Sequence, residues 1–465
     1  MLIQNRGEHF KYLRGKYPVF SYDWYSYQRE GGDLVMKFQF FVGKDICFSP
    51  ESRLKYHPSF DALYANENLS LIDDFVFSIG MIELISYWKA TCSPIVRVEV
   101  GNLNNEAISF WKKLYYHGLG EFFYCNSIRT SLENFMNIEL SQVCKEKELP
   151  VFGLKDETII PVGGGKDSVV TLELLRKCYE VTPMIINPRK ATLDTVIIGG
   201  FSDNYFEIQR KIDPVLLDLN KQGFLNGHTP FSAMLAFYSV LLAVVSGEKN
   251  VALSNESSAN ESTVLGSDVN HQYSKSYEFE ADFRNYVSKY LSKEVNYYSF
   301  LRPLNELQIG YLFSKQTDYF PIFRSCNAGS KTDEWCCKCA KCLFVFIVLS
   351  PFVSAERLRE IFGENLFEKE ELLPIFQELC GLEKEKPFEC VGTIKEVCLA
   401  SIQAMKQYAD LPFLLRYFMQ TPLYEQYKSM CFEEQMRELN PQHFLSEKEL
   451  KIIRGVLKTP SATRI

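Results

Sequence analysis

The sequence predicts an α/β protein in which a parallel sheet covered by helices follows an N-terminal α+β domain and precedes a helical C-terminal region. Between about 155 and 300, short β-rich runs alternate with helical runs, which is typical of such a sheet. Aromatic and β-branched residues fill 20–48, and proline-broken helical segments follow 343. At about 150 residues per domain we expect two or three domains, over 1–150, 151–325 and 326–465.

The amino-acid composition argues against several classes of protein. Hydrophobic residues make up 46% of the chain, enough for a large core, and a disordered protein is excluded. The net charge, 51 basic minus 58 acidic residues or −7, argues against a broad basic face for nucleic acid. The longest apolar stretch, 231–245, is too short and too polar to span a membrane, and the N-terminus has no signal-peptide pattern. We therefore expect a cytoplasmic protein without nucleic-acid or membrane partners.

Each predicted element has its own signal. The turn signal Gly31-Gly32 within 20–48 indicates antiparallel strands, and apolar residues at helical spacing predict helices from Leu71 and over 106–116. In the central region we expect strands over 158–162, 181–186, 214–219, 251–254 and 297–301, and helices over 168–178, 230–245 and 271–291. Beyond them, 343–349 is expected to be a core helix. Ligands of such sheets bind at the carboxyl ends of the strands.

The strongest motif is the run Pro161-Val-Gly-Gly-Gly-Lys-Asp-Ser168 between a predicted strand and a helix. Three glycines let the backbone approach an anion closely, and the free N–H groups of a helix N-terminus favour phosphate. The run is not a Walker A loop, because Ile160 stands where the first glycine is required and Asp167 follows Lys166. We expect a phosphate-binding loop here.

The fourteen cysteines fall into two groups. Five lie between 326 and 342, and the spacing of Cys326, Cys336, Cys339 and Cys342 offers four thiolates for a structural zinc ion or, as the alternative, an iron–sulfur cluster. Cys337 is out of register with them. The other nine are interpreted as small buried apolar residues: Cys47, Cys92, Cys125, Cys144, Cys178, Cys380, Cys390, Cys398 and Cys431.

Polar clusters follow or precede the predicted central elements. Asn226-Gly-His228 precedes a helix, and Ser254-Asn-Glu256 follows a strand. His271 and Lys275 are four residues apart, so on the predicted 271–291 helix they would share one face. Histidine titrates near neutrality and lysine can be tuned by burial, which makes His228, His271 and Lys275 candidates for proton transfer.

The glycine run resembles the Ser-Gly-Gly-x-Asp-Ser loop of the PP-loop ATP pyrophosphatases, with Gly163 in place of the first serine. The resemblance implies an adenine nucleotide alpha hydrolase-like, Rossmann-like domain that cleaves ATP to AMP and pyrophosphate and adenylates its substrate. ATP and Mg²⁺ are the implied cofactors.

The chain as a whole resembles the ATP-dependent UDP-N-acetylmuramoyl-L-alanyl-L-glutamate epimerases. Beyond the loop and the cysteines, the resemblance rests on these stretches: 83–94, 118–124, 226–228, 254–256, 270–276, 301–304, 325–327 and 386–392. It implies inversion of the terminal glutamate of a peptidoglycan precursor, with a UDP-N-acetylmuramoyl dipeptide as the small-molecule substrate. A muramoyl ligase that adds L-glutamate would be a functional partner.

Residue roles follow as expectations from this resemblance. Gly163, Gly164, Gly165, Lys166, Asp167, Ser168 and Asn255 would bind ATP, and Asp167 and Glu256 would contact Mg²⁺. Arg302 and Arg324 would hold a substrate carboxylate or the phosphates. Alternatives remain: another PP-loop adenylating enzyme, acting on a different peptide or as a nucleobase- or tRNA-modifying amidase or thiolase, or a non-catalytic nucleotide-binding zinc protein.

Overall fold

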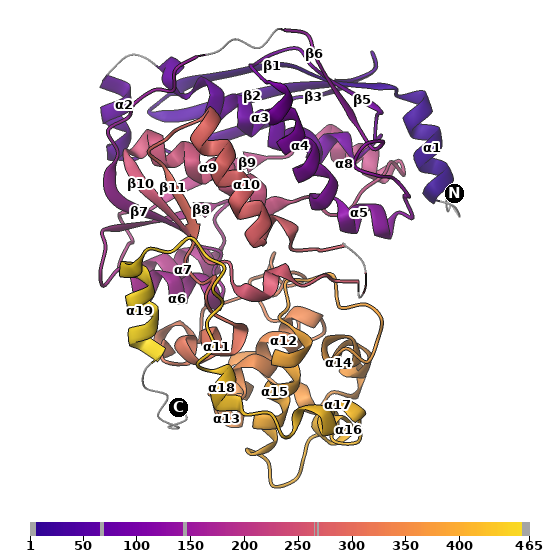
Figure 1. Ribbon diagram of the computed structural model, residues 1–465, viewed down its shortest axis with the longest axis vertical. Helices are drawn as coiled ribbons and strands as arrows, with labels where there is room; N and C mark the ends of the chain where they lie inside the picture. The colour runs from indigo at the N-terminus through magenta and orange to yellow at the C-terminus, as the bar shows by residue number, and fades with distance from the viewer. Residues whose placement is uncertain (1–5, 66–68, 143–146, 265, 267–268, 458–465) are drawn as a thin grey trace.

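A computed structural model describes residues 6–65, 69–142, 147–264, 266 and 269–457 (Figure 1). Its centre is one eleven-stranded sheet with the order β11-β10-β7-β8-β9-β4-β2-β1-β5-β6, and β3 pairs with β2 at the side. The strands are β1 (Val19–Glu30), β2 (Asp33–Val42), β3 (Ile46–Phe48), β4 (Glu51–Leu54), β5 (Ile95–Val98), β6 (Asn137–Leu140), β7 (Lys155–Pro161), β8 (Val181–Ile186), β9 (Phe206–Lys211), β10 (Glu248–Leu253) and β11 (Asn296–Ser299).

The sheet is mostly parallel, with an antiparallel part in its middle. Strands β7, β8, β9, β10 and β11 are parallel neighbours, as are β1, β5 and β6, whereas β2 pairs antiparallel with β1, β3 and β4. The antiparallel pairing of β4 with β9 joins the strands before residue 150 to those after it in one sheet. The predicted antiparallel strands of 20–48 are confirmed, and so are the parallel central strands except the one predicted over 214–219.

Helices α3 (Asp73–Trp88), α4 (Asn105–Gly118), α9 (Phe231–Ser246) and α10 (Tyr277–Tyr290) build the first hydrophobic core (Figure 1). Every residue of α3 from Phe75 to Trp88 is buried. Ile159, Val251 and Tyr297, on three neighbouring strands, also belong to this core. A helix that is apolar all round must be enclosed on all sides, and α3 and α9 are of this kind.

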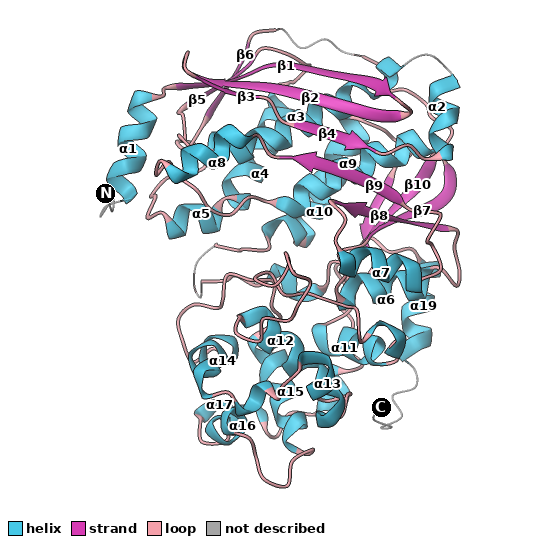
Figure 2. Ribbon diagram, turned by 180° about the vertical axis from the view of Figure 1, so that it is seen from behind, coloured by secondary structure: helices cyan, strands magenta, loops and turns pink. Residues whose placement is uncertain are grey.

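A second core lies on the opposite face of the parallel strands. Because successive strand residues point to opposite faces, Ile160, Ala252 and Tyr298 enter this core instead of the first. It also contains the apolar residues of α6 (Lys166–Leu175), α11 (Glu306–Ser314), α12 (Ala340–Leu349) and α15 (Ile394–Met405). The C-terminal region is helical, as predicted, and packs below the sheet in the view from behind (Figure 2).

The remaining helices lie around these two cores. They are α1 (Arg6–Lys16), α2 (Asp61–Ala65), α5 (Gly120–Cys125), α7 (Lys190–Ile198), α8 (Pro214–Lys221), α13 (Ala355–Phe362), α14 (Leu373–Cys380), α16 (Phe413–Phe418), α17 (Pro422–Tyr427), α18 (Phe432–Gln435) and α19 (Glu447–Leu457). No helix in the described ranges is long and apolar enough to cross a bilayer.

One predicted strand is wrong. Residues 214–219 belong to helix α8, and the strand that fills this place in the sheet is β9. Asp213 caps the helix by accepting a hydrogen bond from Val215 N at 2.8 Å, and Pro214 takes the first helical position, where no N–H is needed. The apolar run Val215-Leu216-Leu217 suggested a strand, but the Asp-Pro pair before it is a helix start signal.

The predicted long helix over 271–291 is shorter than expected. Helix α10 begins at Tyr277 because Ser276 caps it, accepting from Phe279 N at 3.1 Å. His271 lies in a turn, and Lys275 ends a short 3₁₀ helix, Tyr273–Lys275. The prediction that His271 and Lys275 share a helical face is therefore wrong, although both side chains still reach a common neighbour.

Candidate active site

A cavity of about 420 Å³ opens at the carboxyl ends of β7 and β10, where a parallel sheet binds its ligands. Four cationic side chains line it, against one carboxylate, Asp167. The cations are Arg189, Lys275, Arg324 and Lys341. Such a lining suits a ligand that carries several negative charges, such as a nucleoside triphosphate.

The glycine run forms one wall of this cavity as the turn between β7 and α6. Gly163, Gly165, Asp167 and Ser168 line it. Gly164 adopts φ +78°, and a Cβ there would lie 3.0 Å from the carbonyl carbon of Ala191, so the turn requires glycine. Gly165 caps α6, and the carbonyl oxygen of Gly164 accepts a hydrogen bond from Arg324 N at 2.8 Å.

Lys166 does not line the cavity. Its side chain is 1% exposed and forms ion pairs with Asp167 and Glu306. Burial raises the pKa of Glu306, and the ammonium of Lys166 opposes that rise. The side chain of Lys166 thus ties the loop to α11, whereas Asp167 bridges this pair and the cavity.

The other predicted ligand residues divide into two groups. Asn255 and Arg324 line the cavity, and the Asn255 amide donates to Ser299 Oγ at 3.1 Å. Arg302 is fully buried, and its guanidinium donates to the Glu256 carbonyl at 2.7 Å and to the Glu280 carboxylate at 3.0 Å. Glu256 is also buried and accepts from Ser258 Oγ at 2.8 Å.

His228 and His271 lie together, with ring centroids 4.5 Å apart, and both face the carboxylate of Glu121. Burial, together with the charge of His271, lowers the pKa of His228 to about 4. Burial also opposes the charge on His271, but hydrogen bonds to Cys390 and Glu121 outweigh it and raise its pKa to about 9. His228 is therefore neutral and His271 an imidazolium at neutral pH.

This histidine pair offers little to a metal ion. Donor atoms of Glu121, His228 and His271 lie within 4.8 Å of one another, which would suffice for a ligand set. A metal ion, however, would have to displace the proton that the raised pKa of His271 holds on its ring. The ammonium of Lys89 donates to the Gly227 carbonyl at 2.5 Å and adds positive charge beside His228. We interpret the group as a hydrogen-bonded ion-pair cluster.

Cys390 is the common neighbour of His271 and Lys275. It lines the cavity, accepts a hydrogen bond from Lys275 Nζ at 3.1 Å and lies close enough to His271 for the two side chains to shift each other's pKa. Neither Cys390 nor Glu121 was predicted from the sequence to be a site residue. The signal was present, because both lie within stretches of the family resemblance, 386–392 and 118–124. Their spacing along the chain gives no hint of proximity.

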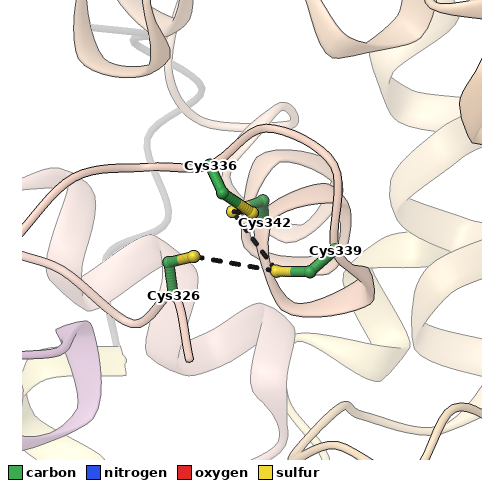
Figure 3. Close-up of side chains that lie close together, drawn as sticks. All are labelled: Cys326, Cys336, Cys339 and Cys342. Carbon is green, nitrogen blue, oxygen red and sulfur yellow. Dashed lines mark hydrogen bonds between the residues drawn. The ribbon is translucent and has the colours of Figure 1, made fainter. Parts of the chain in front are cut away.

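Four cysteine sulfurs converge beside the cavity, as predicted from their spacing (Figure 3). The Sγ–Sγ distances are 3.8 Å for Cys326–Cys339, 3.7 Å for Cys336–Cys342 and 3.5 Å for Cys339–Cys342. Four sulfurs bound at about 2.3 Å to one tetrahedral zinc ion would lie about 3.8 Å apart. The four residues therefore fit a metal ion of this kind.

Most of the remaining cysteines lie apart from this group. Cys337 instead donates to the Phe362 carbonyl at 3.2 Å, in agreement with its predicted place outside the site. Of the nine cysteines interpreted as buried apolar residues, Cys92, Cys380 and Cys398 are buried. Cys47 and Cys390 are half-buried, and Cys125, Cys178 and Cys431 are exposed. Cys144 lies outside the described residues.

Comparison with known proteins places these features in a family. The MurL N-terminal domain matches residues 12–300, and the MurL C-terminal domain matches residues 322–429. No solved structure matches the chain.

Three curated relatives carry the name UDP-N-acetyl-alpha-D-muramoyl-L-alanyl-L-glutamate epimerase. The protein from Micromonospora sp. is 35% identical over 70% of this chain and 74% of its own length. The Salinispora tropica protein is 31% identical over 85% and 86%, and the Xanthomonas oryzae pv. oryzae protein is 33% identical over 71% and 74%. With both domains matched, the chain belongs to the MurL epimerase family.

Proposed function

We propose that this protein inverts the terminal L-glutamate of UDP-N-acetylmuramoyl-L-alanyl-L-glutamate to D-glutamate, and that it first adenylates the substrate with ATP. The names of the three relatives support the substrate and the inversion. The observation that carries the adenylation is the glycine turn at the end of β7, which opens into a cavity lined by four cations. A nucleoside triphosphate and a UDP-linked substrate are both polyanions.

Activation is needed because the α-proton of a free glutamate is hard to remove. The neighbouring carboxylate is already negative and resists a second negative charge on the α-carbon. Attack of that carboxylate on the α-phosphorus of ATP forms an acyl adenylate and releases pyrophosphate. The acyl group then stabilises an enolate, so a base can remove the proton and an acid can return one to the opposite face.

The chain's own residues divide this work in our account. Backbone N–H groups of the glycine turn and the start of α6 bind the pyrophosphate, with Arg189 and Arg324 at the cavity wall. Asp167 is the residue that would hold Mg²⁺, which would neutralise phosphate charge during adenylation. Arg302 and Glu256 support the wall from within, since neither lines the cavity.

The four-cysteine cluster has a structural role in this proposal. Cys326, Cys336, Cys339 and Cys342 would fill all four positions around a zinc ion and leave none for a substrate. Cys342 lies on α12, which is buried along its whole length in the second core. The ion would fix the start of this helix against the cavity wall.

The test is one incubation in D₂O with protein, ATP, Mg²⁺ and UDP-N-acetylmuramoyl-L-alanyl-L-glutamate. AMP, pyrophosphate, and the chirality and α-deuterium content of the glutamate are measured after acid hydrolysis. We expect D-glutamate that carries deuterium, together with AMP. Deuterated D-glutamate without AMP would contradict the adenylation, and AMP without inversion would contradict the epimerase assignment for this substrate.

A further inference from the structure

The mechanism above leaves its base unassigned, and Cys390 is the group in the cavity best placed for that task. It lies in the loop between α14 and α15 and shares the cavity with the glycine turn. Lys275 donates to its sulfur at 3.1 Å, and Lys341 Nζ donates to its carbonyl oxygen. Three segments far apart in sequence therefore meet at Cys390.

These neighbours keep the thiol ionised. Burial by itself would raise the pKa of Cys390, but the ammonium of Lys275, the hydrogen bond from His271 and the charge of Lys341 outweigh it and lower the pKa to about 6. A thiolate is a competent base at neutral pH, whereas a thiol is not. Cys390 is half-buried and faces the cavity, so a ligand can approach its sulfur.

His271 lies between Glu121 and Cys390 and couples their charges. Its Nδ1 faces Glu121 Oε2, and the ring interacts with the Cys390 thiol, which raises the pKa of His271. Glu121 thus stabilises an imidazolium, and the imidazolium stabilises the thiolate. The order carboxylate–imidazole–thiol is the general arrangement by which proteins activate a cysteine.

The predicted candidates are less suited to accept a proton. Lys275 has its pKa raised by the Cys390 and Glu256 charges despite burial, so it is a protonated ammonium. His271 is also protonated, and His228 does not line the cavity. The carboxylate of Asp167 is paired with Lys166. Among the described residues that line the cavity, Cys390 carries a negative charge on a side chain that a ligand in the cavity can reach.

We propose that Cys390 is the catalytic base that removes the α-proton of the adenylated glutamate; this inference rests on the proposed function. The sulfur takes the proton, and the electron pair of the Cα–H bond moves into the activated acyl group to form an enolate. A water molecule donates a proton to the opposite face of the α-carbon, which leaves hydroxide. The Cys390 thiol then releases its proton to solvent, which neutralises that hydroxide and restores the thiolate, and water hydrolyses the acyl adenylate to product and AMP.

The test compares Cys390→Ala and Cys390→Ser with the wild-type chain in the D₂O reaction. A matched control is Cys431→Ser, which changes an exposed thiol that does not line the cavity. We expect both Cys390 variants to form pyrophosphate and AMP at near wild-type rates. Their α-deuterium incorporation and D-glutamate formation should fall by about 10²–10⁴-fold, the usual contribution of a general base.

The outcomes separate the two proposals. A wild-type protein that forms no AMP contradicts the proposed function. Wild-type inversion that persists in Cys390→Ala overturns the role of Cys390 alone. An acyl group covalently attached to Cys390, found by mass spectrometry of the quenched wild-type reaction, would also overturn it, because the thiolate would then be a nucleophile.

A second measurement applies if the Cys390 variants do not fold. The wild-type protein is treated with iodoacetamide between pH 4.5 and 9, and the modified peptide is quantified. We expect half-maximal alkylation of Cys390 near pH 6, protection by substrate, and loss of α-exchange in proportion to modification. A midpoint near 8.5, or full exchange after complete modification, would overturn the proposal.

Discussion

Two side-chain clusters that contain cysteine thiols lie beside one cavity, and the charges around their sulfurs are opposite in sign. In the four-cysteine cluster, sulfurs surround one another, and four neighbouring thiolates repel unless a cation lies between them. In the Cys390 cluster, by which we mean Cys390, Lys275, His271 and Glu121, cations surround a single sulfur. The first environment calls for a metal ion and gives structure. The second provides the positive charge itself and leaves the sulfur free to react.

The largest effect of a single substitution is expected at the four-cysteine cluster. Cys339→Ala removes one of four ligands, and structural zinc contributes directly to folding free energy. We expect the zinc content to fall from one ion per chain and the melting temperature to drop by about 3–5 °C, as for a loss of several kcal/mol in a chain of this length. Elemental analysis and calorimetry measure both quantities.

Cys337→Ser provides the control for that change. This residue is adjacent in sequence, but its sulfur bonds to the Phe362 carbonyl and takes no part in the cluster. We expect one zinc ion per chain and a stability loss of about 1 kcal/mol, the scale of a single hydrogen bond. Equal metal loss in both variants would contradict the assignment of the ligands.

Lys275→Met tests the charge around Cys390. Removing the ammonium withdraws the main stabilisation of the thiolate, so the pKa of Cys390 should rise from about 6 toward its ordinary value. The alkylation midpoint should move up with it, and α-exchange at pH 7 should fall by about tenfold or more, because a thiol with the ordinary pKa of about 8.5 is only about 3% thiolate at pH 7. An unchanged midpoint would mean that Lys275 does not control this thiol.

Glu121→Gln is expected to act more weakly, because it works through His271. Without the carboxylate the imidazolium is less stable, and the pKa of His271 should fall from about 9. The wild-type exchange rate falls as pH drops through about 6, where Cys390 becomes protonated. In the variant this acid limb should shift to higher pH. The charged and titratable groups around the thiol and the ring, which set the position of this limb, are Lys275, Lys341, Glu389, Glu121, His228 and Lys89.

The smallest effect is expected for a substitution at Gly163 in the glycine turn. A Cβ at Gly163 meets no atom within 4 Å, so Gly163→Ser should leave stability within about 0.5 kcal/mol and adenylation intact. Gly164→Ala is the contrasting change, since φ is +78° and the Cβ would press on Ala191. We expect a loss of about 1–2 kcal/mol there and slower AMP formation, read from denaturant unfolding and pyrophosphate release.

The same contrast explains what could be predicted from the sequence. The glycine turn and the four-cysteine cluster are made from residues close together in the chain, so their spacing reveals them. The Cys390 cluster joins α5, the turn at His271 and the loop before α15, and it exists only after folding. Strand β9 was not predicted for a local reason, because the apolar run of α8 resembles a strand although the Asp213-Pro214 pair before it is a helix start signal.

The most direct test of the whole account is the ratio of AMP to D-glutamate in a single wild-type reaction. ATP, Mg²⁺ and UDP-N-acetylmuramoyl-L-alanyl-L-glutamate are supplied, and both products are counted over time. Because each inversion consumes one acyl adenylate in this account, we predict that AMP is formed for every D-glutamate, with none of either when ATP is omitted. Formation of D-glutamate without ATP would contradict it.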